Sequence, residues 1–188
     1  APLGAVYIFT SNGTSWTRTA SLTANDGVIG DEFGDSVALS ADGSTVVIGS
    51  RNATVGGKAG AGAAYVFTLN GATWTQAAKV TASDAAASDK FGFTVSVNAT
   101  GTVFVVGAPF ADAAGKTDLG AVYYFGKSGA TWTQASKLVQ ADLPAESYYG
   151  FSVDLSASGT TLAVGAPNTT IGGNASQGLV YAYFNGAA

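Results

Sequence analysis

The chain has 188 residues and a formal net charge of −4 at pH 7; 47% of its residues are hydrophobic and 11% are charged. A disordered chain would contain more charge and fewer aromatic side chains, so we expect a folded domain. The acidic balance and the lack of any Lys/Arg cluster argue against binding to nucleic acid. Gly, Ser, Thr or Asp interrupts every apolar run, so no membrane-inserted helix is predicted. Cysteine is absent, and disulfide bonds with it.

Within the first repeat of the sequence, four strands are predicted in chain order. The first, over residues 4–9, is an aromatic and β-branched run, and the second, over 16–22, alternates large and small residues. The third begins at Phe33-Gly34 and alternates to residue 39, whereas the fourth, over 45–49, is a continuous apolar run typical of a strand buried on both faces. Turn signals at Asn12-Gly13 and Asp42-Gly43 separate the strands. No segment has helical periodicity, which indicates an all-β fold.

This unit recurs with a period of 58 residues, as the positions of Gly4, Gly62, Gly120 and Gly178 show. The same spacing relates further residues: Tyr7, Tyr65, Tyr123 and Tyr181; Trp16, Trp74 and Trp132; Val37, Val95 and Val153. A fixed period of this length is the signature of a repeat architecture, and four strands per repeat suit a propeller blade. We predict one domain over residues 1–188, with repeats at 4–61, 62–119 and 120–177 and a surplus strand at 178–184.

The repeats carry the motifs EFGDSVALS, STVVIGS and GAAYVF, then KFGFTVSVN, TVFVVGAPF and GAVYYF, then YYGFSVDLS, TLAVGAPN and GLVYAYF. In these motifs the chain resembles the FG-GAP repeat family, the blades of integrin α-chain propellers and of secreted microbial and algal proteins. The resemblance implies three four-stranded antiparallel blades, each with the Phe-Gly strand innermost, followed by the Gly-Ala-Pro strand, the Val-Tyr strand and the Trp strand.

Calcium-binding members of that family have an Asp-rich loop between the Phe-Gly and Gly-Ala-Pro strands. Here the link is a tight turn in every repeat: 41–43, 99–101 and 157–159. These turns lack the several convergent oxygen ligands that Ca²⁺ requires. We therefore expect no calcium site and no cofactor other than N-linked glycans.

On the family's phasing the chain starts in the middle of a blade and ends after the third strand of its last blade. Propellers close with four to eight blades, and bare strand edges invite pairing with another chain. Two explanations stay open: the sequence is an excerpt of a longer propeller, or a terminal strand completes a neighbouring copy by strand addition. For the second, the predicted assembly residues are Val6, Tyr7, Phe9, Val180, Tyr181 and Tyr183.

Five Asn-X-Ser/Thr sequons occur, at Asn12, Asn52, Asn98, Asn168 and Asn174. All five fall in turns or at strand ends, where we expect them to be exposed. Unmodified turn asparagines are the alternative. N-glycosylation of at least two is the preferred interpretation, and it implies a secretory route and an extracellular or cell-surface location.

Other recurrent residues have a structural and a functional interpretation. Aspartates recur at 26, 84 and 142, with others at 31 and 89; we expect them to cap loops through hydrogen bonds to the backbone, the alternative being a weak cation site. The recurrent Trp is expected to pack between blades, the alternative being a sugar-stacking platform. The chain has no His and no Cys, and its acidic residues mark no cleft, so we predict that it is not an enzyme.

The sequence favours a structural extracellular glycoprotein. Its copies would assemble head to tail by β-strand exchange into a fibre or coat, with copies of itself as the main partner. The alternative is an adhesin-like module, cut from a larger FG-GAP propeller, that binds glycans or proteins through its loops.

Overall fold

The computed structural model describes residues 4–184, which form thirteen β-strands. In chain order they are β1 (Val6–Ser11), β2 (Trp16–Leu22), β3 (Phe33–Leu39), β4 (Thr45–Ser50), β5 (Ala63–Asn70), β6 (Thr73–Val80), β7 (Thr94–Val97), β8 (Val103–Ala108), β9 (Ala121–Ser128), β10 (Thr131–Leu138), β11 (Ser152–Leu155), β12 (Thr161–Ala166) and β13 (Leu179–Phe184).

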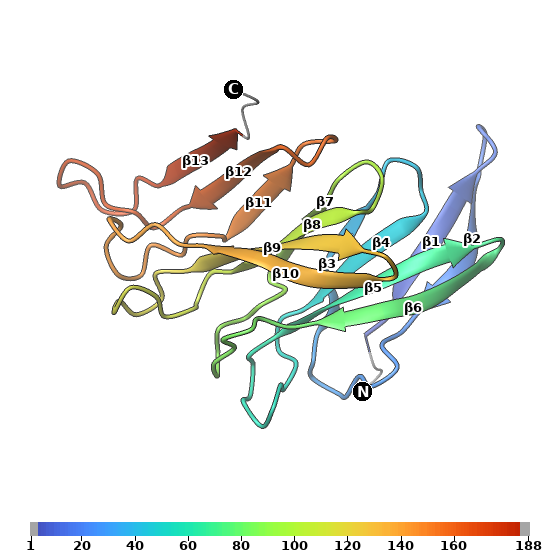
Figure 1. The fold of residues 1–188 in the computed structure, drawn as a ribbon, viewed down its shortest axis with the longest axis horizontal. Helices are drawn as coiled ribbons and strands as arrows, with labels where there is room; N and C mark the ends of the chain where they lie inside the picture. The colour runs from blue at the N-terminus through green and yellow to red at the C-terminus, as the bar shows by residue number, and fades with distance from the viewer. Residues whose placement is uncertain (1–3, 185–188) are drawn as a thin grey trace.

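The strands form four separate antiparallel sheets (Figure 1). Two have four strands each, in the order β3-β4-β5-β6 (blade 1) and β7-β8-β9-β10 (blade 2). Blade 3 has the order β11-β12-β13, and the remaining sheet is the hairpin β1–β2. This arrangement confirms the predicted all-β fold, the propeller-type phasing of the blades and the surplus strand.

Each blade has two faces because successive side chains of a strand point to opposite sides. We call the face toward the preceding sheet the front and the face toward the next sheet the back. On blade 1 the front carries Ile48, Tyr65 and Phe67, which pack on Leu22 of the hairpin. The back carries Val47 and other small or β-branched residues, which pack on the aromatic front of blade 2. Large front residues therefore fill the space above a flatter back face at each junction.

The same packing recurs between blades 2 and 3. The back of blade 2 contributes Val105 and Val122, and the front of blade 3 contributes Tyr149, Leu162 and Val164. Within each front face the Phe-Gly aromatic meets the Val-Tyr strand edge-on: the ring centroids of Phe91 and Tyr123 are 5.3 Å apart in blade 2. Such edge-to-face pairs add to the stabilisation from burial.

Near the axis of the stack the blades touch through their main chains. The innermost strands β3, β7 and β11 contact one another in turn. A Cβ atom on Gly49 would overlap the carbonyl oxygen of Gly92, and one on Gly107 would overlap that of Gly150. Only glycine allows so close an approach of two backbones. The two glycines therefore explain why the Gly-Ala-Pro strand begins its signature with Gly.

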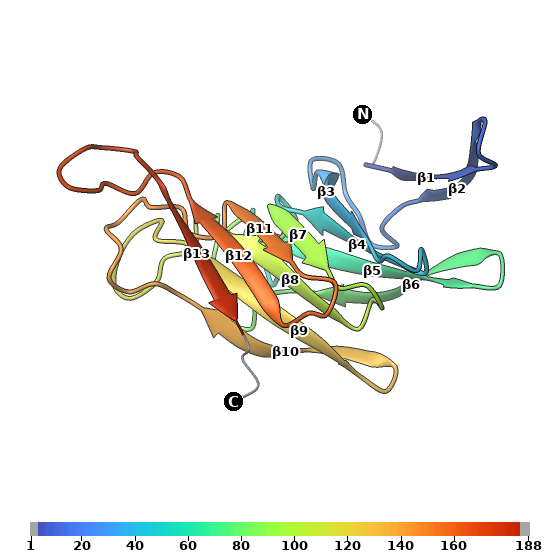
Figure 2. The same cartoon turned by 90° about the horizontal axis from the view of Figure 1, so that it is seen from above.

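The four sheets follow one another along the long axis of the molecule, with the hairpin β1–β2 at one end and blade 3 at the other (Figures 1 and 2). The two end sheets lie apart, so the described part of the chain is an open stack of blades. Within residues 4–184 no helix is long and apolar enough to cross a membrane.

Candidate functional site

The front face of the hairpin is bare because no sheet precedes it in the described chain. Tyr7 and Phe9 are half exposed, whereas Tyr65 and Phe67, their equivalents in blade 1, are buried. The three equivalent tryptophans show the same gradient: Trp16 is 72% exposed, Trp74 is half-buried and Trp132 is 8% exposed. The three equivalent positions are therefore buried according to the sheet in front of them: none for Trp16, the two-stranded hairpin for Trp74 and the four-stranded blade 1 for Trp132.

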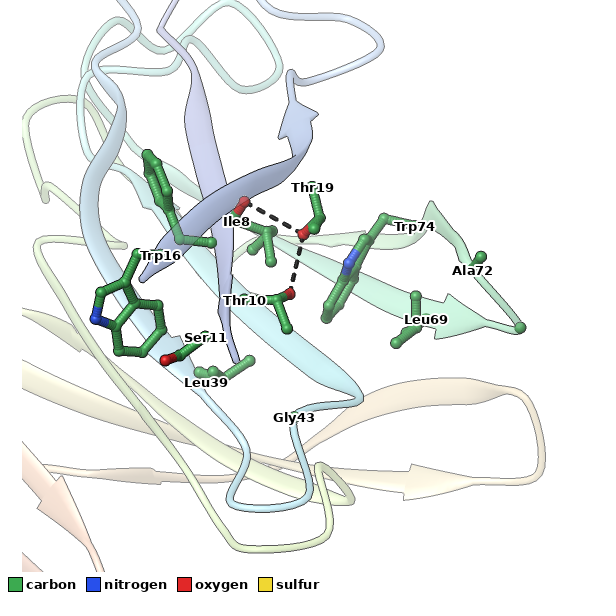
Figure 3. A pocket seen from close by; sticks show the side chains of 12 residues that line it. Ile8, Thr10, Ser11, Trp16, Thr19, Leu39, Gly43, Leu69, Ala72 and Trp74 are labelled. Carbon is green, nitrogen blue, oxygen red and sulfur yellow. Dashed lines mark hydrogen bonds between the residues drawn. The ribbon is translucent and has the colours of Figure 1, made fainter. Parts of the chain in front are cut away.

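A groove of about 490 Å³ runs between the hairpin and blade 1, and Trp16 and Trp74 lie on its walls (Figure 3). It exists because the hairpin contains only the two outer strands of a blade. Residues 4–184 contain no inner strands that would cover blade 1 on this side, and Val37 and Leu39 of β3 are consequently 54% and 57% exposed. Val95, the residue of blade 2 that is equivalent to Val37, is buried.

The other end of the stack lacks the complementary part. Blade 3 has its three inner strands in the described chain, so β13 has an open outer edge. Its back face exposes Val180 and Phe184, which are 74% and 75% accessible. Tyr181 and Tyr183 on its front are half-buried and pack on blade 2.

Of the predicted assembly residues, Tyr7, Phe9 and Val180 are thus exposed at the two ends of the stack. Val6 lies on the back of β1 and packs against blade 1 of its own chain. It therefore belongs to an internal interface of the chain.

A side-chain cluster that we call the clamp joins the hairpin to blade 1. Asp26, in the connection after β2, accepts hydrogen bonds from the Tyr65 hydroxyl at 3.0 Å and from Lys79 Nζ at 2.5 Å. The ammonium group of Lys79 also lies 5.4 Å from the centroid of the Tyr65 ring. The hydrogen bond from Lys79 is the main reason that the pKa of Asp26 lies below its ordinary value.

The clamp recurs between blades 1 and 2. Asp84 accepts hydrogen bonds from the Tyr123 hydroxyl at 2.9 Å and from Lys137 Nζ at 2.6 Å. Burial opposes ionisation of Asp84, but these hydrogen bonds outweigh it and its pKa is lowered. Burial, followed by the hydrogen bond to Asp84, raises the pKa of Tyr123 far above its ordinary value. The clamp thus keeps a charged carboxylate beside a neutral phenol.

The clamp is split at the two ends of the stack. Asp142 is the third aspartate of the series. Among residues 4–184 it receives no hydrogen bond from Tyr181, and no Lys or Arg side chain forms a salt bridge with it. At the opposite end, the Arg18 guanidinium lies 5.1 Å from the centroid of the Tyr7 ring, as Lys79 lies on Tyr65. The blade 3 end of the described chain therefore exposes the carboxylate of Asp142. The hairpin end exposes the Arg18 guanidinium, which lies over the ring of Tyr7.

Of the recurrent aspartates predicted to cap loops, Asp31 and Asp89 do so, whereas Asp26 and Asp84 bind side chains of the following blade instead. Asp31 accepts a hydrogen bond from the backbone N–H of Val28 at 3.0 Å, and Asp89 accepts one from Ala86 at 2.7 Å. Both carboxyl groups are buried beside the turns that they close. The described residues contain no group of three or more His, Cys, Asp or Glu side chains that could hold a metal ion.

Comparison with known proteins agrees with this architecture. The model of the FG-GAP repeat matches residues 16–67, 74–125 and 132–183, which together are most of the chain. The chain belongs to the FG-GAP repeat family. A search of curated proteins finds no match. FG-GAP repeats form β-propeller-like modules that are typical of extracellular or surface proteins, where they serve in binding or as structural elements.

Each FG-GAP match begins at the recurrent Trp, whose predicted packing between sheets is confirmed for Trp74 and Trp132. Trp132 packs in the cluster between blades 1 and 2, with Lys127 Nζ 4.5 Å from its ring centroid. Trp16 is the exception, because the blade that would cover it is absent from the described chain. Sequence reasoning missed the clamp, although the 58-residue step from Lys79 to Lys137 was its signal.

The sequons of this FG-GAP chain differ in accessibility. Asn12 and Asn174 are exposed, whereas Asn52 and Asn168 are half-buried and take part in side-chain hydrogen bonds. The expectation of exposure is wrong for Asn98, which is 5% exposed. Its Nδ2, the atom that would carry a glycan, donates to the hydroxyls of two threonines while its Oδ1 accepts from the backbone of the same turn. Asn98 therefore builds the turn after β7.

Two groups of acidic residues lie near the first strands of blades 1 and 3. The carboxylates of Glu32 and Asp35 both form salt bridges with Arg51, whose Nε lies 2.6 Å from Glu32 Oε2 and 3.3 Å from Asp35 Oδ2. Asp142 and Glu146 are exposed in the connection between blades 2 and 3. The first group is thus a salt-bridge network at the edge of blade 1, and the second borders the open clamp.

Proposed function

We propose that this FG-GAP chain is a structural, glycosylated protein of the cell exterior whose copies join head to tail by strand exchange into a fibre or coat. A single observation supports it most strongly: the two ends of the described stack expose the two halves of an interface that the molecule already makes internally. The aromatic front of the hairpin is free at one end, and the open back and outer edge of blade 3 are free at the other.

The exposed surface favours association over a free monomer. Tyr7, Phe9 and Trp16 form one apolar face, and Val180 and Phe184 form another. Contiguous apolar patches and unpaired strand edges both favour contact with another chain. Because the two ends of the stack differ, a contact between one end and the other is head-to-tail and propagates into a filament unless a rotation closes it into a ring.

Glycans fit this proposal. Asn12 lies in the turn of the hairpin and Asn174 in the loop before β13, both exposed and away from the packed faces of the blades. Glycans there would cover the rim of a fibre without blocking contact between sheets. The extracellular location typical of FG-GAP repeats is consistent with the secretory route on which such modification takes place. The proposal includes no catalytic step and no metal.

Electron microscopy of the purified 188-residue chain over a range of concentrations, without denaturant, tests the proposal. We expect filaments whose axial repeat is one chain, formed above a threshold concentration. Monomers at every concentration would overturn it, and glycan and protein binding screens would then test the adhesin-like module that the sequence leaves as the alternative. Closed rings would also overturn the fibre, because they show that the contact does not propagate.

A further inference from the structure

We infer that the junction between two copies has one defined register. The hairpin β1–β2 of one copy enters blade 3 of the next, takes the third and fourth strand positions, and displaces β13, while Arg18 closes the clamp on Asp142. This inference rests on the head-to-tail assembly proposed above and names the segment that leaves, the segment that enters and the ion pair that marks the register.

The first argument is that β1 and β13 are versions of the same strand. Tyr7 and Tyr181 are separated by three repeat lengths, as are Phe9 and Tyr183. Both strands hold the position that β5 holds in blade 1 and β9 in blade 2. The edge of β12 can pair with only one of them. In the described chain β13 pairs with β12 over six residue pairs, while the inner edge of β1 is unpaired.

The second argument is completeness. With β13 in place, blade 3 has three strands and the hairpin has two; with the hairpin inserted, β11-β12-β1-β2 is a four-stranded blade of the same order as blades 1 and 2. The hairpin can enter as a unit because its turn is closed by local hydrogen bonds: Asn12 Oδ1 accepts from the backbone N–H groups of Thr14 and Ser15. The β1–β2 ladder is therefore kept, and the β12 ladder is exchanged strand for strand.

The third argument is burial. After insertion, Tyr7 and Phe9 occupy the places of Tyr181 and Tyr183 against the back of blade 2, and Trp16 comes to lie as Trp132 does. The inner strands β11 and β12 then cover the exposed Val37 and Leu39 of the incoming copy. The hairpin keeps its packing on its own blade 1 throughout, because that contact uses its back face. The exchange thus buries the apolar surface that is exposed at the hairpin end, and in return it releases Tyr181 and Tyr183 of β13 from the back of blade 2.

The fourth argument is charge. In each complete clamp an aspartate of one connection binds a tyrosine and a lysine of the following blade. Insertion of the hairpin brings Tyr7, with Arg18 already on its ring, to the position where Asp142 lacks both partners. Arg18 pairs with Phe9 in the β1–β2 ladder, as Gln76 pairs with Phe67 in blade 1. From that position its long side chain extends to the ring of Tyr7. A simple addition of β1 to the outer edge of β13 would leave this pair apart.

A reversible lock on β13 tests the displacement. Ala163 of β12 and Ala182 of β13 are direct partners, and the chain has no native cysteine, so Ala163→Cys with Ala182→Cys places one disulfide across this pair. We expect the oxidised variant to remain monomeric and the reduced variant to form filaments. The matched control is Val47→Cys with Val66→Cys, the equivalent pair in blade 1, which should assemble in both redox states.

A charge exchange tests the register in the chain without introduced cysteines. Arg18→Asp and Asp142→Arg should each raise the threshold concentration for assembly about tenfold, and the double variant should return it toward the wild-type value. If wild-type filaments form and neither the lock nor the single charge variants affect them, the register proposed here is wrong while head-to-tail assembly stands. If the wild-type chain forms no filaments, the proposed function itself fails.

Discussion

The three equivalent tryptophans provide the most direct measurement of what a neighbouring sheet contributes. Trp16, Trp74 and Trp132 occupy the same position of the repeat but are exposed, half-buried and buried in turn. Replacing each with Ala should therefore destabilise the monomer in the order Trp132, Trp74, Trp16. Because all three residues lie at the same position of the outermost strand, differences in strand propensity largely cancel between the three variants.

The magnitudes follow from burial. Truncating a buried Trp to Ala costs about 3–5 kcal/mol. Trp132 should fall at the lower end, about 3 kcal/mol, because its buried Nε1–H has no hydrogen-bond partner in the described chain and removing an unsatisfied donor offsets part of the loss. For a chain of this size, that lowers Tm by about 6–12 °C. Trp74→Ala should cost about 2 kcal/mol, and Trp16→Ala should stay within about 0.5 kcal/mol.

Urea unfolding followed by far-ultraviolet circular dichroism, at a concentration below the assembly threshold, measures all three. Trp132→Phe is the matched control, since it keeps an aromatic ring, removes the unpaired N–H and should cost only about 1 kcal/mol. Equal losses for Trp16→Ala and Trp132→Ala would show that the hairpin face is covered in the monomer, and the account of the bare end would be refuted. At concentrations that support filaments, Trp16→Ala should weaken assembly.

Further predictions concern the clamp, the axial glycines and the sequons. Folding lowers the pKa of Asp84 from its ordinary value of 3.8, so the stability that its carboxylate contributes is present above pH 3.8 and is lost as the pH falls below that value. The free energy of unfolding of Asp84→Asn should therefore depend less steeply on pH in the acid range than that of the wild-type chain. Gly107→Ala should destabilise by about 1–3 kcal/mol, because its Cβ meets a backbone oxygen. Gly126→Ala, whose Cβ meets nothing within 4 Å, should be neutral or stabilising by about 0.5 kcal/mol in the same urea assay. Peptide mass spectrometry of protein from its native source should find glycan on Asn174 and none on Asn98, and a glycan on Asn98 would contradict its role in the turn.

Much of the fold could be predicted from the sequence because the repeat has no insertions. Equal spacing identified the strands, and the apolar run over 45–49 marked a strand that the structure buries on both faces. The spare strand followed from the phasing of the motifs. These features depend on local pattern and on the period, both of which are visible in a single chain.

The site was less predictable because it depends on which repeat has a neighbour. Trp16 and Trp132 are equivalent in sequence, yet their burial differs with their place in the stack. The clamp joins Asp26, in the connection after the hairpin, to Lys79 of blade 1, which is 53 positions further along the chain. No local sequence pattern predicts that contact. Asn98 has a sequon, but its amide is used within the turn formed by residues 98–102. Such roles follow from three-dimensional packing.

The close main-chain contact between adjacent blades has a consequence for the evolution of the molecule. Where Gly49 meets Gly92 and Gly107 meets Gly150, the spacing of adjacent blades is set by backbone atoms that all repeats share. Side chains elsewhere can diverge without altering the angular step from one blade to the next. Duplication or loss of a whole 58-residue unit would therefore lengthen or shorten the array while leaving every remaining junction in its original geometry.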